Sequence, residues 1–248
     1  MNPIFENAVD SLKAGIEFYL FGKEGRPIKF AILSVYQCVE LFLKEKLYRF
    51  HPLLIYRNID KPIDDDSQTV GVSETLGRLS NLGVKLTKEE TSDIITLQKQ
   101  RNRIEHHRFE RDAAHPEMVG QALKFLYNFL PKHLETTLEE HLTADEFRKV
   151  RSLILSYDEL LAEAEREVES QTAKVSKGDA IRDAHQIECP ECGHFTLVVN
   201  SDRGDFCFFC HSEQEVEQCS HCGEYYPAYQ LEGVGICEAC FHEIINKD

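Results

Sequence analysis

Hydrophobic positions recur at helical spacing through roughly the first 160 residues of the chain. Asn2 followed by Pro3 is typical of a helix start, because asparagine caps the first turn and proline lacks an N–H that would be left unpaired there. The helix predicted from these residues ends near Phe21. A second predicted helix, from about Pro27 to Phe50, is apolar on most sides. Such a helix is buried all round, either by its own domain or by a partner subunit.

Further helices are predicted from capping signals and from periodic apolar residues. The segments Thr87–Glu90 and Thr143–Glu146 both match a capping box, in which threonine and glutamate satisfy the first backbone N–H groups of a helix. Between them, apolar residues from Val119 to Leu138 repeat at steps of three and four, and Pro131 predicts a kink in that helix.

The pattern changes twice along the chain. After Leu161 the apolar stripe fades and most residues are charged or small, which predicts a charged linker or a solvated helix over residues 161–188. A cysteine-rich region then occupies residues 189–248. The sequence therefore predicts a mainly α protein, with a helical bundle over residues 1–160 followed by a small second domain.

Eight of the nine cysteines fall in two consecutive units of the same design. The units CPECGHFTLVVNSDRGDFCFFC and CSHCGEYYPAYQLEGVGICEAC each hold two C-x2-C pairs, with fourteen residues between the pairs and a glycine after the second cysteine. Four thiolates at this spacing suit a tetrahedral zinc ion. We predict two zinc sites, formed by Cys189, Cys192, Cys207 and Cys210 and by Cys219, Cys222, Cys237 and Cys240.

Sequential pairing of the cysteines is favoured because the two units have equal length and each closes on itself. Interleaved pairing, an iron–sulfur cluster and redox-active cysteine pairs are the alternatives. Four protein ligands leave no place for an activated water, which favours structural zinc ions. The units resemble tandem zinc ribbons with short β-hairpins, and this resemblance implies a binding module.

Charge restricts the partners of the chain. It holds 43 acidic and 28 basic residues, for a net charge of −15, so any contact with nucleic acid must be local. Residues 185–248 carry twelve acids and two bases, so this tail would repel the phosphates of a nucleic acid. A protein is the possible partner that remains for it. The sequence has no apolar run that spans a bilayer and no signal peptide at its N-terminus. We therefore expect no membrane partner and a cytoplasmic location.

The local exception is a basic segment from Lys99 to Arg111, with five bases and two acids. On a helix, one stripe would hold Ile94, Leu97, Arg101 and Ile104. Arg101 thus stands where an apolar residue is expected, and its charge must be paired or must face a ligand. A structural interpretation is an ion pair with Glu105 four residues later, with the histidines that follow as ordinary residues near a helix C-terminus.

The same segment resembles the motif of HEPN domains, a helical family of nucleotide-binding and ribonuclease modules. The motif is an arginine, often followed by asparagine, with a histidine a few residues later. Arg101, Asn102 and His106 match it, and the apolar helix over residues 27–50 also resembles the family. A second histidine, His107, departs from the pattern and leaves the catalytic position open, although the spacing from Asn102 favours His106.

The resemblance covers about residues 1–160 and implies a metal-independent endoribonuclease that cleaves RNA as a homodimer, such as a toxin or defence effector. Arg101, Asn102, His106 and His107 would form its catalytic centre. Histidine transfers protons near neutral pH, and the donors of arginine suit phosphate oxygens. The acidic zinc-ribbon tail would then regulate or dock the enzyme. The alternative is a non-catalytic HEPN module that binds nucleotide or protein, with the ribbons used for assembly.

Overall fold

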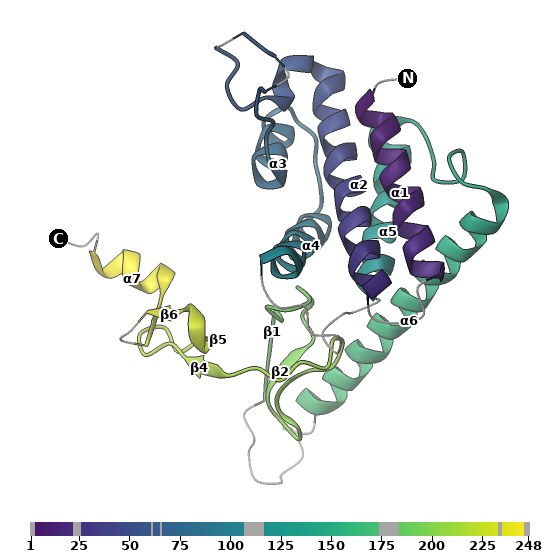
Figure 1. Cartoon of the computed structure of the whole chain (residues 1–248). Coiled ribbons are helices and arrows are strands. Elements are labelled where there is room, and N and C mark those ends of the chain that lie inside the picture. The colour runs from purple at the N-terminus through teal and green to yellow at the C-terminus, as the bar shows by residue number, and fades with distance from the viewer. Residues whose placement is uncertain are drawn as a thin grey trace. The chain divides into compact units, whose positions relative to one another are not determined.

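A computed structural model of the chain describes residues 3–21, 26–60, 62–64, 66–106, 117–173, 184–232 and 235–245. These residues form two compact units, Met1–Tyr157 and Asp158–Asp248. Figure 1 shows helices throughout the first unit, and short strands with a final helix toward the end of the second. Among the described residues, no helix is both long enough and apolar enough to cross a membrane.

The first unit is helical, as the apolar periodicity predicts. In chain order its elements are α1 (Pro3–Phe21), α2 (Arg26–Phe50), the 3-10 turn η1 (Pro52–Ile55), α3 (Val72–Asn81), α4 (Lys88–His106), α5 (Glu117–Phe129), the π-helical turn η3 (Leu130–Leu134) and the first half of α6 (Ala144–Ala173). The predicted kink site Pro131 lies in η3, where a π-helical turn continues α5. The predicted capping box of α6 is present, since the Thr143 N–H donates to Glu146 at 2.7 Å.

Helix α2 is the centre of the first unit. It contacts α1, η1, α3, α4 and α5, and Figure 1 shows α1 running beside it. The fully buried side chains of α2 include Val39, Phe42, Leu43 and Leu47. The burial that its sequence predicts is thus supplied largely by helices of its own domain. On its exposed side, Phe30 remains 47% exposed and packs against Phe18 of α1 with ring centroids 5.5 Å apart.

Two glycines permit close helix crossings in the first unit. A Cβ atom at Gly15 of α1 would lie 2.5 Å from Cγ2 of Val35 in α2. A Cβ atom at Gly120 of α5 would lie 2.9 Å from Cβ of Tyr157 in α6. Real Cβ atoms do not approach so closely, so these helices pack at distances that only glycine allows.

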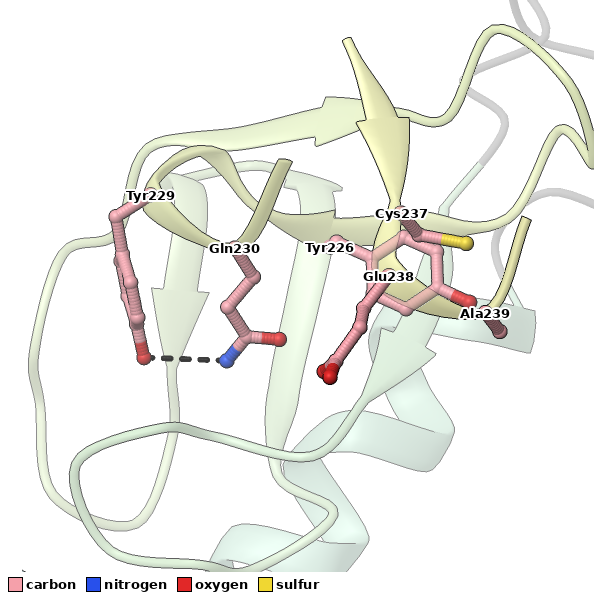
Figure 2. Close-up of a pocket in the computed structure, with 6 residues that line it drawn as sticks. All are labelled: Tyr226, Tyr229, Gln230, Cys237, Glu238 and Ala239. Carbon is pink, nitrogen blue, oxygen red and sulfur yellow. Dashed lines mark hydrogen bonds between the residues drawn. The ribbon is translucent and has the colours of Figure 1, made fainter. Parts of the chain in front are cut away.

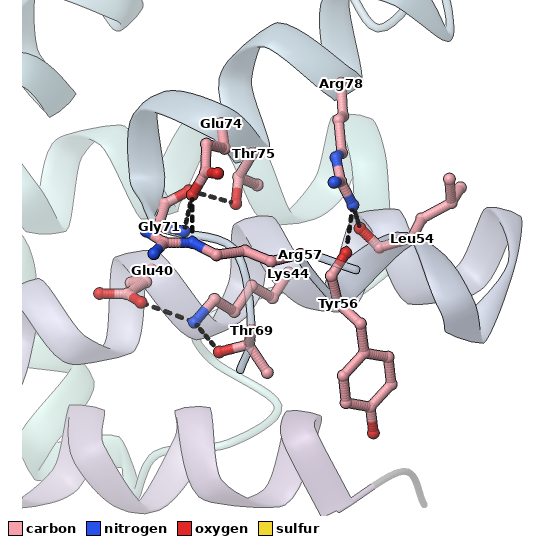
Figure 3. A network of polar contacts seen from close by, with 10 residues as sticks. All are labelled: Glu40, Lys44, Leu54, Tyr56, Arg57, Thr69, Gly71, Glu74, Thr75 and Arg78. Carbon is pink, nitrogen blue, oxygen red and sulfur yellow. Dashed lines mark hydrogen bonds and ion pairs between the residues drawn. The ribbon is translucent and has the colours of Figure 1, made fainter. Parts of the chain in front are cut away.

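The segment between α2 and α3 is fastened by two arginines, as Figure 3 shows. Arg57 donates from Nε to the Glu74 carboxylate at 3.2 Å, and the same carboxylate accepts from the Gly71 N–H at 2.9 Å. Arg78 donates to the carbonyl oxygens of Leu54 and Tyr56 at 2.6 and 2.8 Å. The loop is therefore held near the start of α3 by the Arg57 side chain, and near its end by the backbone carbonyls that Arg78 binds.

The second unit combines the end of α6 with three small antiparallel sheets. Its further elements are β1 (His185–Ile187), β2 (Leu197–Ser201), β3 (Gly204–Cys207), β4 (Val216–Gln218), β5 (Tyr225–Pro227), η5 (Ala228–Gln230), β6 (Leu231–Glu232), β7 (Ile236–Cys237) and α7 (Glu238–Ile245). The strands pair in the orders β1-β2-β3, β4-β5 and β6-β7. These pairs are the short β elements expected from the spacing of the cysteine pairs.

The segment predicted as a charged linker or solvated helix is helical over residues 161–173, but this helix is partly buried instead of solvated all round. Residues 161–173 belong to α6, and Ala164 and Val168 are buried in a cluster with Val198 and Phe206. The Gln171 Oε1 atom accepts a hydrogen bond from the Asp202 N–H at 3.3 Å. The last turns of α6 therefore form part of the core of the second unit. Residues 174–183 of the predicted linker lie outside the described residues.

Candidate metal centres and the Arg101 segment

The eight clustered cysteines form two tetrads, paired sequentially as the sequence predicts. Within each tetrad the four sulfur atoms lie within 4.8 Å of one another. The Sγ–Sγ distances are 3.7 Å for Cys189–Cys210 and for Cys192–Cys207, and 3.9 Å for Cys222–Cys237. A zinc ion with bonds of about 2.3 Å in a tetrahedron would separate its sulfur ligands by about 3.8 Å. Both tetrads thus have dimensions that fit one metal ion each.

Glycine shapes the first turn of each tetrad. The Gly193 N–H donates to the Cys189 carbonyl at 2.8 Å, and the Gly223 N–H donates to the Cys219 carbonyl at 2.9 Å. Both glycines have a positive φ, of 72° and 77°. This left-handed backbone lets the turn place two sulfur atoms on one side of the site, and glycine adopts it without a clash at Cβ.

The second C-x2-C pair has a different local structure in each of the two cysteine repeats. In the first unit of the repeat, Cys207 ends β3 and a turn follows, in which the His211 N–H donates to the Cys207 carbonyl at 2.9 Å. In the second, Cys237 ends β7 and Cys240 lies in the first turn of α7. The two cysteine repeats therefore have equal spacing but different local structures, a turn in the first and a helix in the second.

The crowding of four thiols within 4.8 Å explains why a cation suits each site. Hydrogen bonding between Cys189 and Cys192 lowers the pKa of the first thiol and raises the pKa of the second, because one must be the donor. The backbone N–H groups of Cys222 and Cys237 lower the pKa of the Cys219 thiol to about 6. Four crowded thiolates repel one another, and a divalent ion removes that repulsion.

Both sites are closed by protein ligands. All four cysteines of the first tetrad are buried, and three of the second are buried while Cys222 is exposed. Hydroxyl groups lie beside the first tetrad: the Thr196 Oγ1 atom is 3.2 Å from the Cys207 sulfur, and the Ser212 Oγ atom is 3.1 Å from the Cys210 sulfur. Hydroxyls at this distance can donate to a ligating thiolate and orient it.

The start of α4 is fixed by the predicted capping box. The Thr87 N–H donates to the Glu90 carboxylate at 2.7 Å, and the Glu90 N–H donates to the Thr87 hydroxyl at 3.0 Å. Along the helix the apolar stripe is buried, with exposed fractions of 0% for Ile94, 2% for Leu97 and 6% for Ile104. The helix thereby presents a fixed face to the core.

Arg101 lies at the edge of this stripe with its charge paired. Its Nη2 atom is 2.8 Å from Oε2 of Glu105, and its Nη1 atom donates to Oδ1 of Asn102 at 3.0 Å. The guanidinium carbon lies 5.8 Å from the ring centre of Tyr36 in α2, a cation–π distance. The Arg101 side chain is 35% exposed. The structure brings the side chains of Arg101 and Asn102 together. It also contains the Arg101–Glu105 ion pair that is predicted as the alternative to a catalytic role.

The predicted histidines are described only in part. Helix α4 ends at His106, and the helical backbone places this position one turn after Asn102. The side chain of His106 and the whole of His107 lie outside the described residues.

A second polar group lies on α2 near Arg101. Tyr36 is buried, and this burial, with the charge of Glu40, raises the pKa of its hydroxyl above the ordinary value. Lys44 is paired with Glu40 at 2.7 Å and donates to the Thr69 hydroxyl at 3.1 Å (Figure 3). Tyr36 and Thr69 are partners that the sequence pattern does not reveal, because they depend on how α4 and the loop before α3 pack on α2.

Comparison with models of known protein families, with curated proteins and with solved structures gives no match. The sequence motif and the helical fold are thus the only support for the HEPN resemblance, whereas the cysteine tetrads rest on their own geometry.

Proposed function

We propose that this protein is a metal-independent endoribonuclease of the HEPN type whose C-terminal tail is held together by two structural zinc ions. The observation that carries the proposal is the exposed edge of α4. There the Arg101 guanidinium stays accessible beside Asn102, one helical turn before the end of the helix at His106.

Each cysteine tetrad would bind one zinc ion through four thiolates. The sulfur separations of 3.7 and 3.9 Å are those of a tetrahedral site. Because every ligand comes from the protein, the ions would act on folding rather than on a substrate. Elemental analysis of the purified chain should find two zinc ions per molecule, and one ion or none would contradict this assignment.

The proposed reaction is cleavage of RNA by its own 2′-hydroxyl group. The 2′ oxygen of one nucleotide attacks the adjacent phosphorus and displaces the 5′ oxygen of the next nucleotide. A base takes the proton of the 2′-hydroxyl while its oxygen bonds to phosphorus, and an acid gives a proton to the 5′ oxygen as the P–O5′ bond breaks. Histidine serves both proton transfers near neutral pH, and two copies of the chain would supply two histidines. The products are a 2′,3′-cyclic phosphate and a 5′-hydroxyl.

Arg101 would stabilise the charge that develops on the phosphate oxygens. Its planar donors can bind two oxygens at once, as they already bind the oxygens of Glu105 and Asn102. An exchange of Glu105 for a phosphate costs little, because ion pairs that are a third exposed contribute only about 0–1 kcal/mol.

The test is RNA cleavage by the full-length protein, followed by identification of the product ends. His106→Ala should lower the rate by about a hundredfold or more, the usual effect of removing a general acid or base. His107→Ala is the matched comparison, and a larger loss there would move the role by one residue. Arg148→Ala removes an exposed arginine of α6 and should leave the rate unchanged. Wild-type activity in both histidine variants would refute the catalytic assignment.

A second candidate function is RNA or nucleotide binding without cleavage. The ion pair with Glu105 favours it, because the charge of Arg101 is satisfied without a substrate. In that case the protein would bind RNA oligonucleotides without generating new ends, and Arg101→Ala would weaken the binding.

A further inference from the structure

The second cysteine unit carries exposed side chains beside its metal site, around a hollow that Cys237 of the tetrad also lines. We propose that this surface binds a short segment of a partner protein in which lysine or arginine stands beside apolar residues. The proposal concerns β5, η5, β7 and α7, and it does not depend on RNA cleavage.

One part of this surface is a hollow of about 460 Å3 beside the second tetrad. Figure 2 shows Tyr229 and Gln230 of η5 on one side, and Tyr226, Glu238 and Ala239 on the other. The Gln230 amide donates to the Tyr229 hydroxyl at 3.2 Å. The polar ends of Tyr229, Gln230 and Glu238 point to the same side of the hollow (Figure 2). A carboxylate, oxygen acceptors and an aromatic face in one hollow suit the cation of a lysine or arginine side chain.

The other part of the surface is the free face of α7. Phe241 is 36% exposed, Ile244 43% and Ile245 53%. Ile244 and Ile245 follow Phe241 by three and four positions, so both lie beside it on the helix surface. Glu238, which lines the hollow, lies one turn before Phe241, so the hollow and the apolar face are continuous. Contiguous exposed apolar side chains of this kind mark contact sites for other proteins.

Charge decides what the surface can bind. From Cys219 to Ile245 the sequence holds four acids and no lysine or arginine. A nucleic acid would be repelled by this charge, and an acidic peptide likewise. A basic segment is attracted over the whole unit and can place one cation in the hollow while an adjacent apolar side chain contacts Phe241.

The experiment uses the full-length zinc-loaded protein and three labelled synthetic peptides of equal length, with binding measured by fluorescence anisotropy. The first peptide alternates lysine or arginine with leucine or phenylalanine, the second replaces its bases by glutamate, and the third replaces its apolar residues by serine. Only the first should bind, and its affinity should fall as salt is added. Glu238→Gln and Phe241→Ser should each weaken it about tenfold, as expected for a central contact.

Glu213→Gln is the matched control, because it removes one exposed acid outside the hollow and should change the affinity less than about twofold. Zinc content and circular dichroism establish that each variant is folded. The proposal is overturned if no peptide binds at about 1 mM, if the basic and acidic peptides bind alike, or if Glu238→Gln acts no more strongly than the control. Single-stranded RNA whose binding Phe241→Ser weakens, or a dimer of this chain that Phe241→Ser dissociates, would assign the surface to another occupant and equally contradict the proposal.

Discussion

Arg101 shows how a single residue can break a pattern and still fit the fold. The helical stripe of α4 assigns its position to an apolar side chain, and its neighbours Leu97 and Ile104 are buried. Arg101 instead lies at the edge of the stripe, where Glu105, Asn102 and the ring of Tyr36 surround the guanidinium. The sequence could predict Glu105 as a partner because it lies one turn away. It could not predict Tyr36, which belongs to another helix.

Glu105→Gln tests whether Arg101 is held ready for a phosphate. The substitution removes the carboxylate that competes with RNA, so RNA affinity should rise by about two- to fivefold, since an exposed pair is worth about 0–1 kcal/mol. The measurement is fluorescence anisotropy with a labelled RNA oligonucleotide at low salt. Asp145→Asn removes an equivalent exposed charge from α6 and serves as the control. Weaker binding by Glu105→Gln than by the control would show that Arg101 needs Glu105 in place.

At the scale of elements, the sequence predicts best where one local signal decides the structure. Capping boxes locate the starts of α4 and α6, and the spacing of the cysteine pairs locates both tetrads. The end of α6 is harder to predict, because Ala164 and Val168 stand among charged residues and are buried only through contact with the β2–β3 hairpin. The helix α7 is also hard to predict, because the two cysteine repeats have the same spacing. A turn follows the third cysteine in the first repeat, whereas a helix follows it in the second.

Gly15→Ala tests the close crossing of α1 and α2. The new Cβ atom would lie 2.5 Å from Cγ2 of Val35, a branched side chain that cannot swing aside, so the free energy of unfolding should fall by about 1–3 kcal/mol. Urea denaturation followed by circular dichroism measures the change. At Gly77 of α3 no atom lies within 4 Å of the added Cβ, and Gly77→Ala should stabilise the protein by about 0.5–1 kcal/mol. Equal effects of the two substitutions would contradict the packing described for α1 and α2.

At the scale of the whole molecule, the chain divides into a helical unit with its own apolar core and a smaller unit whose core is built around two cysteine tetrads. The sequence predicts this division because apolar helices and clustered cysteines are signals of different kinds. The fading apolar stripe predicts a division near residue 160, and the structure divides after Tyr157, but the sequence does not reveal that α6 continues from one unit into the other.

Dimer formation is the second property of the whole molecule that can be tested. The proposed mechanism takes its two histidines from two copies of the chain. The exposed pair of Phe18 and Phe30 on α1 and α2 is an apolar surface that a second copy would cover. Sedimentation should give about twice the 28.6 kDa mass of the chain at micromolar concentration, and Phe30→Ser should shift it toward the monomer. A monomer for the wild-type protein would contradict the proposed dimer.

The most direct test of the account is RNA cleavage by the full-length protein before and after removal of zinc with a chelator. In the proposed function the chemistry belongs to the helical unit, and the metal ions serve only the folding of the tail. Chelation should release two zinc ions per chain and unfold the second unit, while cleavage continues and yields 2′,3′-cyclic phosphate ends. Loss of cleavage on chelation, restored by added zinc or magnesium, would contradict the account.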